Sequence, residues 1–449
     1  MVDVDYEVDV AIVGGGACGL TTALRAVESG AQSVAIFEKS TRQGCNSQFS
    51  SGSLAAGGTR FQAEAGVVDS PQRHAEDLMR VSGDRASEEI VRALCGAAPC
   101  YVEWLADQLG YPMELGLDMP RAGQSVPRLH TDVGRLGGAR LIDTLRRAVG
   151  DAERIAFIDN TPGTGLLVDD RGVWGITVRE PGEEKKVRAG AVVLAADGFG
   201  ASQEMLARFA PDAVGRVYGG VSTSTGDAIS WAMAIGAQTD NMAAFLGHGL
   251  MVSATGTRLN PSLPLLGAVF VDPTGQRFVE ESAQGYSKLG SILMAQSSRR
   301  ALILWDEQAM SAAENSELMR DSKQANAWKR YEDLESLSAA TDIAVDALAR
   351  AIDGSHDTPG IGAPLRSLAP PLYATWVTGG ILTTQGGLRV DTGGRVLRAD
   401  RSVIRGLYAG GGSAAGISGS SADGYSSGNG LLTAFGFAWL IGQYIGSRS

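Results

Sequence analysis

Short apolar runs alternate with a small-residue segment at the beginning of the chain. Val10 to Val13 form an apolar run that predicts a buried strand, and a glycine-rich turn and a helix-like segment follow it. A second apolar run, Val34 to Phe37, ends on Glu38. This order of strand, helix and strand predicts a βαβ unit, the building block of a parallel sheet.

The turn between the first strand and the helix carries the fingerprint G-x-G-x-x-G, in the segment Gly14-Gly15-Gly16-Ala17-Cys18-Gly19. Gly14 allows the tight turn, Gly16 lets the backbone approach a pyrophosphate, and Gly19 lets helix and strand pack closely. The helix N-terminus adds N–H donors and a positive dipole. Glu38 follows at the distance where a carboxylate accepts hydrogen bonds from a ribose. The segment predicts a dinucleotide site without distinguishing FAD from NAD.

Later segments favour FAD. The stretch from Lys39 to Gly58 is rich in small and hydroxyl residues, as expected of backbone that runs along a large planar cofactor. An apolar run over 191–196 leads into the turn Asp197-Gly198, and a second glycine-rich strand end follows at Gly406 to Gly412. Because this second strand end returns the chain to the cofactor after a complete βαβ unit, we expect FAD rather than NAD.

The middle of the chain differs in character, with polar segments of helical pattern over 311–333 and 342–352. We therefore predict an α/β fold with a Rossmann-like FAD-binding domain, formed by residues 1–245 and 376–449, and an inserted α+β substrate (capping) domain, residues 246–375. Residues 157–178 predict a pair of β-hairpins. The uncharged segment 431–445 is shorter than the roughly 20 residues that span a bilayer, so we expect a buried helix.

Composition narrows the class of protein. The 449 residues are 44% hydrophobic and 20% charged, typical of a soluble globular protein large enough for two domains. A net charge of −11, without a basic run, argues against nucleic-acid binding. The acidic N-terminus leads directly into the first strand and leaves no room for a signal peptide, which predicts a cytoplasmic protein without membrane insertion. The four cysteines match no haem or iron–sulfur pattern, so we expect an external electron acceptor.

Two histidines in the first part of the chain are expected to have no chemical role. We predict that His74 is a solvated residue on the outside of a helix. His130 is expected to make a loop hydrogen bond rather than to line an active site.

The cofactor motifs resemble those of the flavoproteins that include fumarate reductase, succinate dehydrogenase and 3-ketosteroid dehydrogenase. The similar segments are K-x-x-x-x-G-x-N-S at Lys39 to Ser47, S-G-S-L-A-A-G-G at 51–58, V-V-L-A-A-D-G-F-G at 192–200 and G-L-Y-A-G-G-G at 406–412. Members with covalent flavin have a histidine where Gly52 stands, so the resemblance implies non-covalent FAD. The resemblance and the fingerprint together assign as FAD-binding Gly14, Gly16, Ala17, Cys18, Gly19, Glu38, Lys39, Asn46, Ser47, Gly52, Ser53, Ala55, Asp197, Gly198, Gly411, Gly412, Asn429, Gly430, Leu431 and Leu432.

The positions that hold substrate in fumarate reductases are largely replaced. The family arginine after R-F-x-N-E falls on Gly285, the H-T-M-G-G histidine falls on Thr383, and the late substrate arginine is absent from 419–430. Among the four positions compared, His248 keeps its residue. The family also often has an acidic residue where Gly412 stands, so the contacts to the ribityl chain are expected to differ.

The replacements resemble 3-ketosteroid dehydrogenases. Residues 281–286 are similar to their E-S-A-P-Y segment with one inserted residue, and 424–428 to their late tyrosine-plus-glycine segment. The resemblance implies that Tyr286 abstracts the proton alpha to a ketone. It implies that Tyr425, supported by Ser427 and by N–H groups between Gly428 and Gly430, polarises the carbonyl oxygen, while flavin N5 takes the hydride.

We therefore predict an FAD-dependent dehydrogenase (desaturase) that introduces a double bond beside a ketone. The expected substrate is a small-molecule cyclic ketone, from an oxocyclohexane acid to a 3-ketosteroid. One alternative is a fumarate reductase-like enzyme of small unsaturated carboxylates that uses His248 and arginines such as Arg277 or Arg299. Another is a flavin-bearing protein without catalysis of its own.

Overall fold

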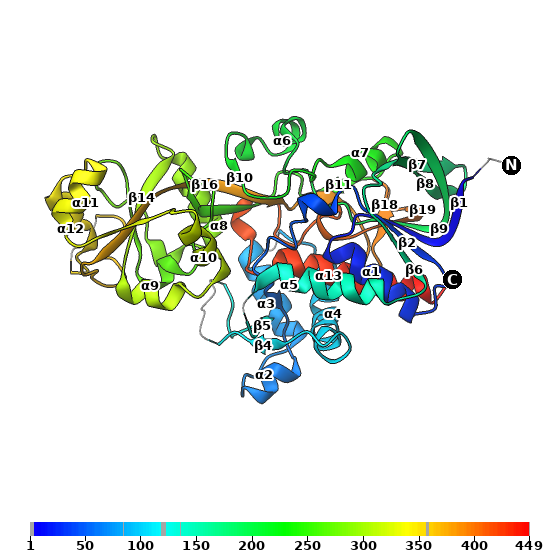
Figure 1. Ribbon diagram of the computed structural model, residues 1–449, viewed down its shortest axis with the longest axis horizontal. Helices are drawn as coiled ribbons and strands as arrows, with labels where there is room; N and C mark the ends of the chain where they lie inside the picture. Colours follow the sequence, from blue (N-terminus) through cyan, green and yellow to red (C-terminus); the bar gives the residue numbers. More distant parts are fainter. Residues whose placement is uncertain (1–3, 84, 118–122, 135, 356–358, 449) are drawn as a thin grey trace.

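The computed structural model describes residues 4–83, 85–117, 123–134, 136–355 and 359–448. The molecule is elongated, with a large, mainly parallel sheet at one end and a second sheet at the other (Figure 1). This mixed architecture confirms the predicted α/β class with a Rossmann-like core.

The large sheet is organised around β1, in which Val10 to Ile12 are completely buried. β1 pairs in parallel with β2 and β9, and β6 and β19 extend the parallel order on either side. β7 and β8 continue from β9 and β18 pairs with β19, all in antiparallel order. Burial on both faces explains why the C-terminal halves of the central strands β1 and β9 are apolar. The strands are β1 (Tyr6–Val13), β2 (Val34–Phe37), β6 (Ile155–Ile158), β7 (Gly163–Asp169), β8 (Gly172–Glu180), β9 (Glu183–Leu194), β18 (Arg395–Leu397) and β19 (Val403–Ala409).

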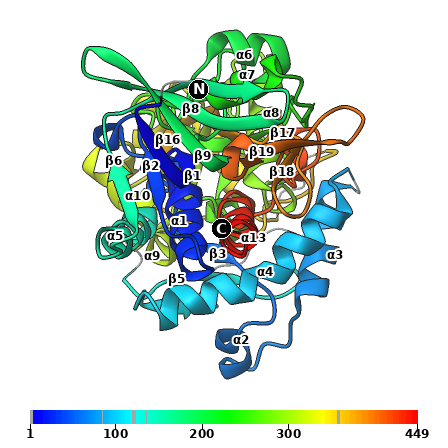
Figure 2. The same cartoon turned by 90° about the vertical axis from the view of Figure 1, so that its right-hand side faces the viewer.

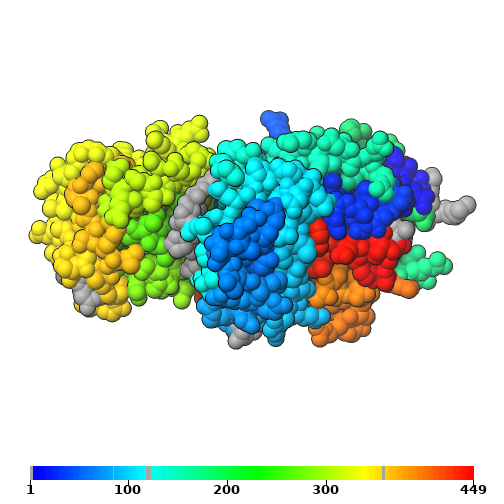
Figure 3. Space-filling view, turned by 90° about the horizontal axis from the view of Figure 1, so that it is seen from below, coloured from blue at the N-terminus to red at the C-terminus, as the bar shows by residue number. Residues whose placement is uncertain are grey.

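Helices from both ends of the chain cover this sheet. α1 lies beside α13, and α5 and α4 pack against these two (Figure 2). Figure 3 shows α2 to α5, coloured blue to cyan, in the middle of one face of the molecule, beside α13 in red. The helices are α1 (Ala17–Glu28), α2 (Arg60–Glu64), α3 (Pro71–Ser82), α4 (Glu88–Asp107), α5 (Gly137–Gly150), α6 (Gln203–Phe209), α7 (Asp227–Ala234) and α13 (Asn429–Gly446).

The buried helix predicted for 431–445 is confirmed by α13, in which Phe435 and Phe437 are completely buried. Among the described residues, no helix combines the length and apolar character needed to cross a membrane.

The second sheet is organised around β16, which pairs with β10, β12, β14 and β15, while β13 pairs with β14. β16 then runs from this sheet toward the large one (Figure 1). The strands are β10 (Val217–Tyr218), β12 (Phe245–Val252), β13 (Val269–Val271), β14 (Arg300–Asp306), β15 (Lys329–Tyr331) and β16 (Leu372–Thr384). The helices are α8 (Tyr286–Ala295), α9 (Glu307–Ala313), α10 (Glu317–Gln324), α11 (Leu334–Thr341) and α12 (Val345–Ile352).

Two small sheets complete the fold. β3 (Leu54–Ala55), β5 (Leu129–Asp132) and β4 (Met113–Leu115) form one, and β11 (Thr239–Asp240) pairs with β17 (Gly387–Leu388) in the other. The predicted domain boundaries fall within strands of the second sheet, at the start of β12 and inside β16. The division into domains stays a prediction.

Two predicted elements are wrong. The helical segment over 311–333 is interrupted: α9 ends at Ala313, Ser316 caps a new helix, and Asn326 has a positive φ before β15 pairs with β16. Helical periodicity did not detect these ends because they depend on capping and strand pairing. The second hairpin, β7 with β8, is present, but β6 pairs in parallel with β2 instead of forming the first hairpin.

Candidate active site

The turn after β1 brings the glycine fingerprint to the end of two parallel strands. The register of β1 and β2 places Glu38 beside this turn, where its Oε2 accepts the N–H of Gly15 at 2.7 Å. A Cβ on Gly19 would collide with the carbonyl of Gly14, so this position is required by packing of helix on strand. Gly16 instead has only Cys45 nearby, at 3.7 Å, and its other surroundings are open.

A cavity of about 110 Å³, which we call the glycine-turn cavity, lies in front of this turn. The N-terminus of α1 has no side-chain cap, so its first N–H groups are available to a bound anion. Lys39 lies on the same wall, where its ammonium group pairs with Asp227 at 2.8 Å. This end of the site combines an uncapped helix with the carboxylate of Glu38.

A second cavity of about 230 Å³, which we call the tyrosine cavity, continues from the first. Asn46, Ser47, Asp197, Gly411 and Gly412 are among the residues that line both cavities. The two cavities therefore form one elongated site between the large sheet and the second sheet.

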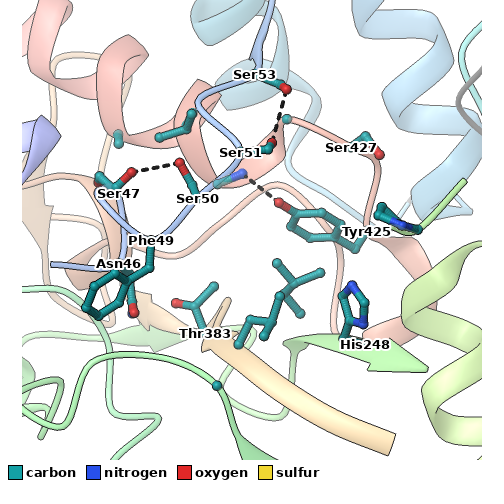
Figure 4. A pocket seen from close by; sticks show the side chains of 18 of the residues that line it. Asn46, Ser47, Phe49, Ser50, Ser51, Ser53, His248, Thr383, Tyr425 and Ser427 are labelled. Carbon is teal, nitrogen blue, oxygen red and sulfur yellow. Dashed lines mark hydrogen bonds between the residues drawn. The ribbon is translucent and has the colours of Figure 1, made fainter. Parts of the chain in front are cut away.

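Tyr286 and Tyr425 meet in the tyrosine cavity, although they are far apart in the sequence. Their rings are 6.2 Å apart and packed edge to face, and the Tyr286 hydroxyl hydrogen-bonds that of Tyr425. The hydroxyl of Tyr425 also accepts the N–H of Gly430 at 3.2 Å, in the first turn of α13 (Figure 4). Burial raises the pKa of Tyr425 although both hydrogen bonds lower it, so this hydroxyl keeps its proton at neutral pH.

His248 lies next to Tyr286, with 5.2 Å between the ring centroids. Its Nδ1 accepts the N–H of Leu250 at 3.2 Å, which places the ring hydrogen on Nε2. Burial, and then the charge of Arg258, lower the pKa of His248 to about 3. The ring is therefore neutral at physiological pH.

The structure places the predicted cofactor residues in two groups. Those that line one or both cavities are Gly14, Gly16, Ala17, Cys18, Glu38, Lys39, Asn46, Ser47, Ser53, Asp197, Gly411, Gly412, Gly430 and Leu431. Those that lie behind the lining are Gly19, Gly52, Ala55, Gly198, Asn429 and Leu432. Behind the lining, Asn429 is buried and donates to the hydroxyl of Ser418, and a Cβ on Gly52 would lie 2.7 Å from the backbone of Gly137.

The remaining predicted catalytic residues also line the tyrosine cavity. Gly428 has a φ of +94° and is the N-cap residue of α13, and Ser427 precedes it. The carbonyl of Ser427 accepts a hydrogen bond from Gln124. Among the described residues, no hydrogen bond joins the hydroxyl of Ser427 to Tyr425, so its support for Tyr425 stays a prediction.

The shape and lining of the joined cavities fit FAD. The glycine-turn cavity offers helix N–H groups for a pyrophosphate and the Glu38 carboxylate for a ribose. The shared wall of small residues leaves room for a flat ring system to reach the tyrosine cavity. The site is thus open along its whole length for a ligand with a nucleotide at one end and a planar ring at the other.

Comparison with known proteins agrees with this chemistry. The FAD binding domain family (FAD_binding_2) matches residues 9–431. The chain belongs to the FAD binding domain family. Its relatives are FAD-dependent oxidoreductases, and FAD is the cofactor of this flavoprotein.

Curated relatives are identical to this flavoprotein at about a quarter of the aligned positions. An NADH:fumarate oxidoreductase of Klebsiella pneumoniae is 28% identical over 455 residues, covering 98% of this chain and 48% of that protein. The chain thus spans about half the length of that relative. A probable fumarate reductase of Shewanella frigidimarina is also 28% identical, covering 91% of this chain and 70% of that protein.

Solved structures include both branches that the motifs resemble. An open conformation of a flavocytochrome c3 fumarate reductase has a TM-score of 0.83 at 26% identity, covering 99% of this chain and 78% of that chain. The 3-ketosteroid-Δ4-(5α)-dehydrogenase from Rhodococcus jostii RHA1 has a TM-score of 0.78 at 23% identity, covering 99% and 98%. The similarity to the 3-ketosteroid dehydrogenase shows a shared fold.

The arginines named for a carboxylate site lie elsewhere in this flavoprotein. Arg277 is buried and forms an ion pair with Glu281 at 2.6 Å, while its Nη1 donates to the carbonyl of Gly362. Arg299 lies in the turn before β14 and does not line the tyrosine cavity. Of the residues named for the carboxylate alternative, His248 lines the cavity.

The sequence analysis missed two charged residues of the tyrosine cavity, Arg258 and Glu317. Arg258 lies in the segment after β12, and Glu317 begins α10. Neither belongs to a recognisable motif. The fold of the second sheet brings them to the cavity, so the sequence carries no local signal for them.

The two histidines of the first part behave differently from one another. The prediction for His74 is wrong: it is 1% exposed on α3, and burial lowers its pKa to about 3, because this side of α3 packs on α4. His130 lies in β5, is buried, and hydrogen-bonds Thr59 at 2.8 Å. It does not line either cavity.

Proposed function

We propose that this flavoprotein is a ketone dehydrogenase that introduces a carbon–carbon double bond alpha,beta to a ketone, most naturally a cyclic one. The observation that carries the proposal is the pairing of Tyr286 with Tyr425 and the N–H of Gly430 in one cavity. When bound, FAD supplies the acceptor for the hydride that leaves the beta carbon.

Tyr425 and Gly430 are proposed to hold the ketone oxygen. The Tyr425 hydroxyl accepts the Gly430 N–H, so its own hydrogen is free to be donated to a carbonyl in the cavity. The Tyr425 hydroxyl, itself hydrogen-bonded by the Gly430 N–H, is a neutral donor that stabilises the negative charge developing on this oxygen as the alpha proton leaves. The raised pKa of Tyr425 suits this role because the hydroxyl stays protonated.

Tyr286 is proposed to take the alpha proton as a phenolate, after its own proton has passed to solvent. It is the first residue of α8, and the positive end of a helix stabilises negative charge on a nearby oxygen. The neutral ring of His248 lies against Tyr286, where it orients the phenol without adding charge. Both residues come from 246–375, which we propose as the substrate domain that the sequence predicts.

A fumarate reductase-like activity on small unsaturated carboxylates is the second candidate. The relatives named above as fumarate reductases favour it, and so does His248 in the cavity. The neutral state of His248 weakens it, because a neutral imidazole is a poor partner for a carboxylate. The third candidate is a flavin carrier without catalysis. Such a protein would not need Tyr286 and Tyr425 paired in a cavity, so their pairing argues against it.

An anaerobic titration tests the proposal. Flavin absorbance of the holoenzyme is followed while cyclic ketones of increasing size are added, and the reduced enzyme is then offered unsaturated dicarboxylates. We expect bleaching by a ketone. Reoxidation by unsaturated acids with no response to ketones would favour the second candidate, and no response to either would favour the third. An external electron acceptor and a cytoplasmic location are further proposals from the sequence.

A further inference from the structure

Arg258 brings a positive charge into the tyrosine cavity. It follows β12, and its backbone forms a bridge to Met251. Its Nη2 donates to the carbonyl of Phe49 at 2.6 Å. Within the described part of the chain, no carboxylate lies within ion-pair distance of this guanidinium, whereas Arg128 and Arg277 both have such partners.

Glu317 is an acidic residue that lines the same cavity, but it does not neutralise the positive charge of Arg258. Burial raises the pKa of Glu317 to about 7, with a further contribution from Asp321, while Arg258 and Arg320 lower it. Its Oε2 is buried and has no hydrogen-bond partner in the described residues. At neutral pH this carboxyl is therefore partly protonated, and Arg258 keeps an excess positive charge.

The surroundings make this charge costly without a ligand. Phe49, Leu246, Pro261, Tyr286 and Leu318 line the same cavity, and burial lowers the pKa of Arg258. A buried guanidinium is stabilised best by a carboxylate, which it binds with two parallel hydrogen bonds. No residue in the described part of the chain supplies that carboxylate, so a ligand is the natural source.

We propose that Arg258 binds a carboxylate of the substrate, so that the ketone oxidised here is a cyclic oxo acid rather than a neutral ketone. This inference rests on the proposed function and selects its substrate class. The ketone oxygen lies at Tyr425 and Gly430, and the acid group lies at Arg258. The tyrosine cavity, about 230 Å³ before the flavin ring enters it, is smaller than the roughly 300 to 1,000 Å³ of pockets for drug-sized ligands, which favours a single ring.

A binding experiment tests Arg258 without requiring turnover. Cyclohexanecarboxylate, which has the acid but no ketone, and cyclohexanecarboxamide are titrated into oxidised holoenzyme, and the shift of flavin absorbance gives each Kd. We expect the acid to bind wild type roughly 10- to 100-fold more tightly than the amide, as a charge-assisted hydrogen-bonded pair implies. Arg258→Gln is expected to remove this preference, and Arg258→Lys to keep part of it.

Arg320→Gln is the matched control, because Arg320 is exposed on α10 beside the cavity but does not line it. This variant is expected to keep the preference for the acid. Equal binding of acid and amide by wild type would overturn the proposal, and that comparison needs no variant. An unchanged preference in Arg258→Gln would overturn it as well.

Turnover separates this inference from the proposed function. With 4-oxocyclohexanecarboxylate, Arg258→Gln should raise KM roughly 10- to 100-fold, and the ratio of kcat/KM for this acid to kcat/KM for cyclohexanone should fall by the same factor. An equal loss of kcat with both ketones would mean that Arg258 acts on Tyr286 and would overturn the carboxylate assignment. Tight, Arg258-dependent binding of the acid without oxidation of any ketone would refute the proposed function alone.

Discussion

The carboxylate of Asp197 occupies the space that a Cβ on Gly412 would take. Asp197 has a φ of +66°, a conformation that favours glycine, and its Oδ2 accepts hydrogen bonds from Asn46 and Ser224, each at 2.5 Å. The family that this chain resembles often has an acidic residue at position 412. We infer that the acid at 197 takes its place on the shared wall of the two cavities, an exchange of acid and glycine between the two positions.

This exchange predicts that the two positions are coupled. Gly412→Glu should lower FAD affinity at least about tenfold, because its side chain would meet the Asp197 carboxylate in a buried site. Adding Asp197→Gly should restore most of the affinity. FAD binding to apoprotein, followed by flavin fluorescence, measures both effects. Gly96→Ala, on α4 with open space around it, is the control. Additive losses in the double variant would contradict the exchange.

The two tyrosines are expected to affect catalysis and not cofactor binding. Tyr425→Phe removes a donor to the ketone oxygen and should lower kcat roughly 10²- to 10³-fold. Tyr286→Phe removes the base and should lower kcat roughly 10²- to 10⁴-fold and suppress exchange of the alpha hydrogens with solvent deuterium. FAD content should stay unchanged in both.

Tyr373→Phe serves as the control for the two catalytic variants. Tyr373 lies on β16, and its hydroxyl hydrogen-bonds Glu307, away from the cavities. Full turnover in Tyr286→Phe and Tyr425→Phe with a ketone that bleaches the wild type would show that neither tyrosine is catalytic.

Glu317 predicts a pH dependence of acid binding. Its carboxyl has a pKa of about 7. The charged groups that act on it are Arg258, Arg320, Asp321 and Asp132. As the pH rises from 6 to 8, Glu317 becomes charged and competes with a substrate carboxylate, so the Kd for cyclohexanecarboxylate should rise up to about tenfold. Glu317→Gln should bind the acid with a nearly constant Kd over this range. The same slope in both proteins would exclude Glu317 as the cause.

Arg128 is expected to stabilise the fold. It is completely buried, and its guanidinium pairs with Asp69 and Asp77, each at 2.7 Å. Arg128→Met would leave two carboxylates without their cation, and we expect it to lower the free energy of unfolding by about 3 to 5 kcal/mol in urea titrations at pH 7. Arg92→Met, at an exposed ion pair, should change it by less than about 1 kcal/mol.

The same cluster has a pH signature. Burial alone would raise the pKa of Asp69 and Asp77. The hydrogen bonds led by those from Arg128 outweigh this effect, so both pKa values lie below the ordinary value. Their contribution to stability is present above about pH 4 and is lost as the pH falls below it. The difference between wild type and Arg128→Met should therefore shrink as the pH falls from about 4 toward 2. A constant difference would argue against the ion pairs.

FAD is expected to be released when the protein is denatured. Gly52 has a φ of +66°, and a side chain there would meet the backbone of Gly137 rather than point into either cavity. A histidine at this position would be strained and could not reach the ring, so Gly52→His should lower stability without creating a covalent flavin. Acid precipitation, followed by flavin absorbance in supernatant and pellet, measures attachment. Flavin retained in the wild-type pellet would refute non-covalent binding.

The sequence was informative wherever function depends on local backbone. The βαβ unit, the uncapped helix after Gly16 and the buried helix α13 follow from spacing and hydrophobic pattern, because strand, turn and helix geometry is set within a few residues. It was misleading over 311–333, where strand pairing with β16 replaced a helix. It was also wrong for His74, since helical pattern does not say which side of α3 is covered.

The sequence by itself identified FAD as the cofactor, because the glycine fingerprint has a fixed local geometry, and it named the two tyrosines by their resemblance to known motifs. The tertiary structure alone decided that Tyr286 and Tyr425 share one cavity, that Arg277 forms an ion pair with Glu281, and that Arg258 lines the tyrosine cavity. These relationships join segments of β12, α8 and α13 that are distant in the chain. Their meeting depends on how two sheets pack, which no local pattern encodes.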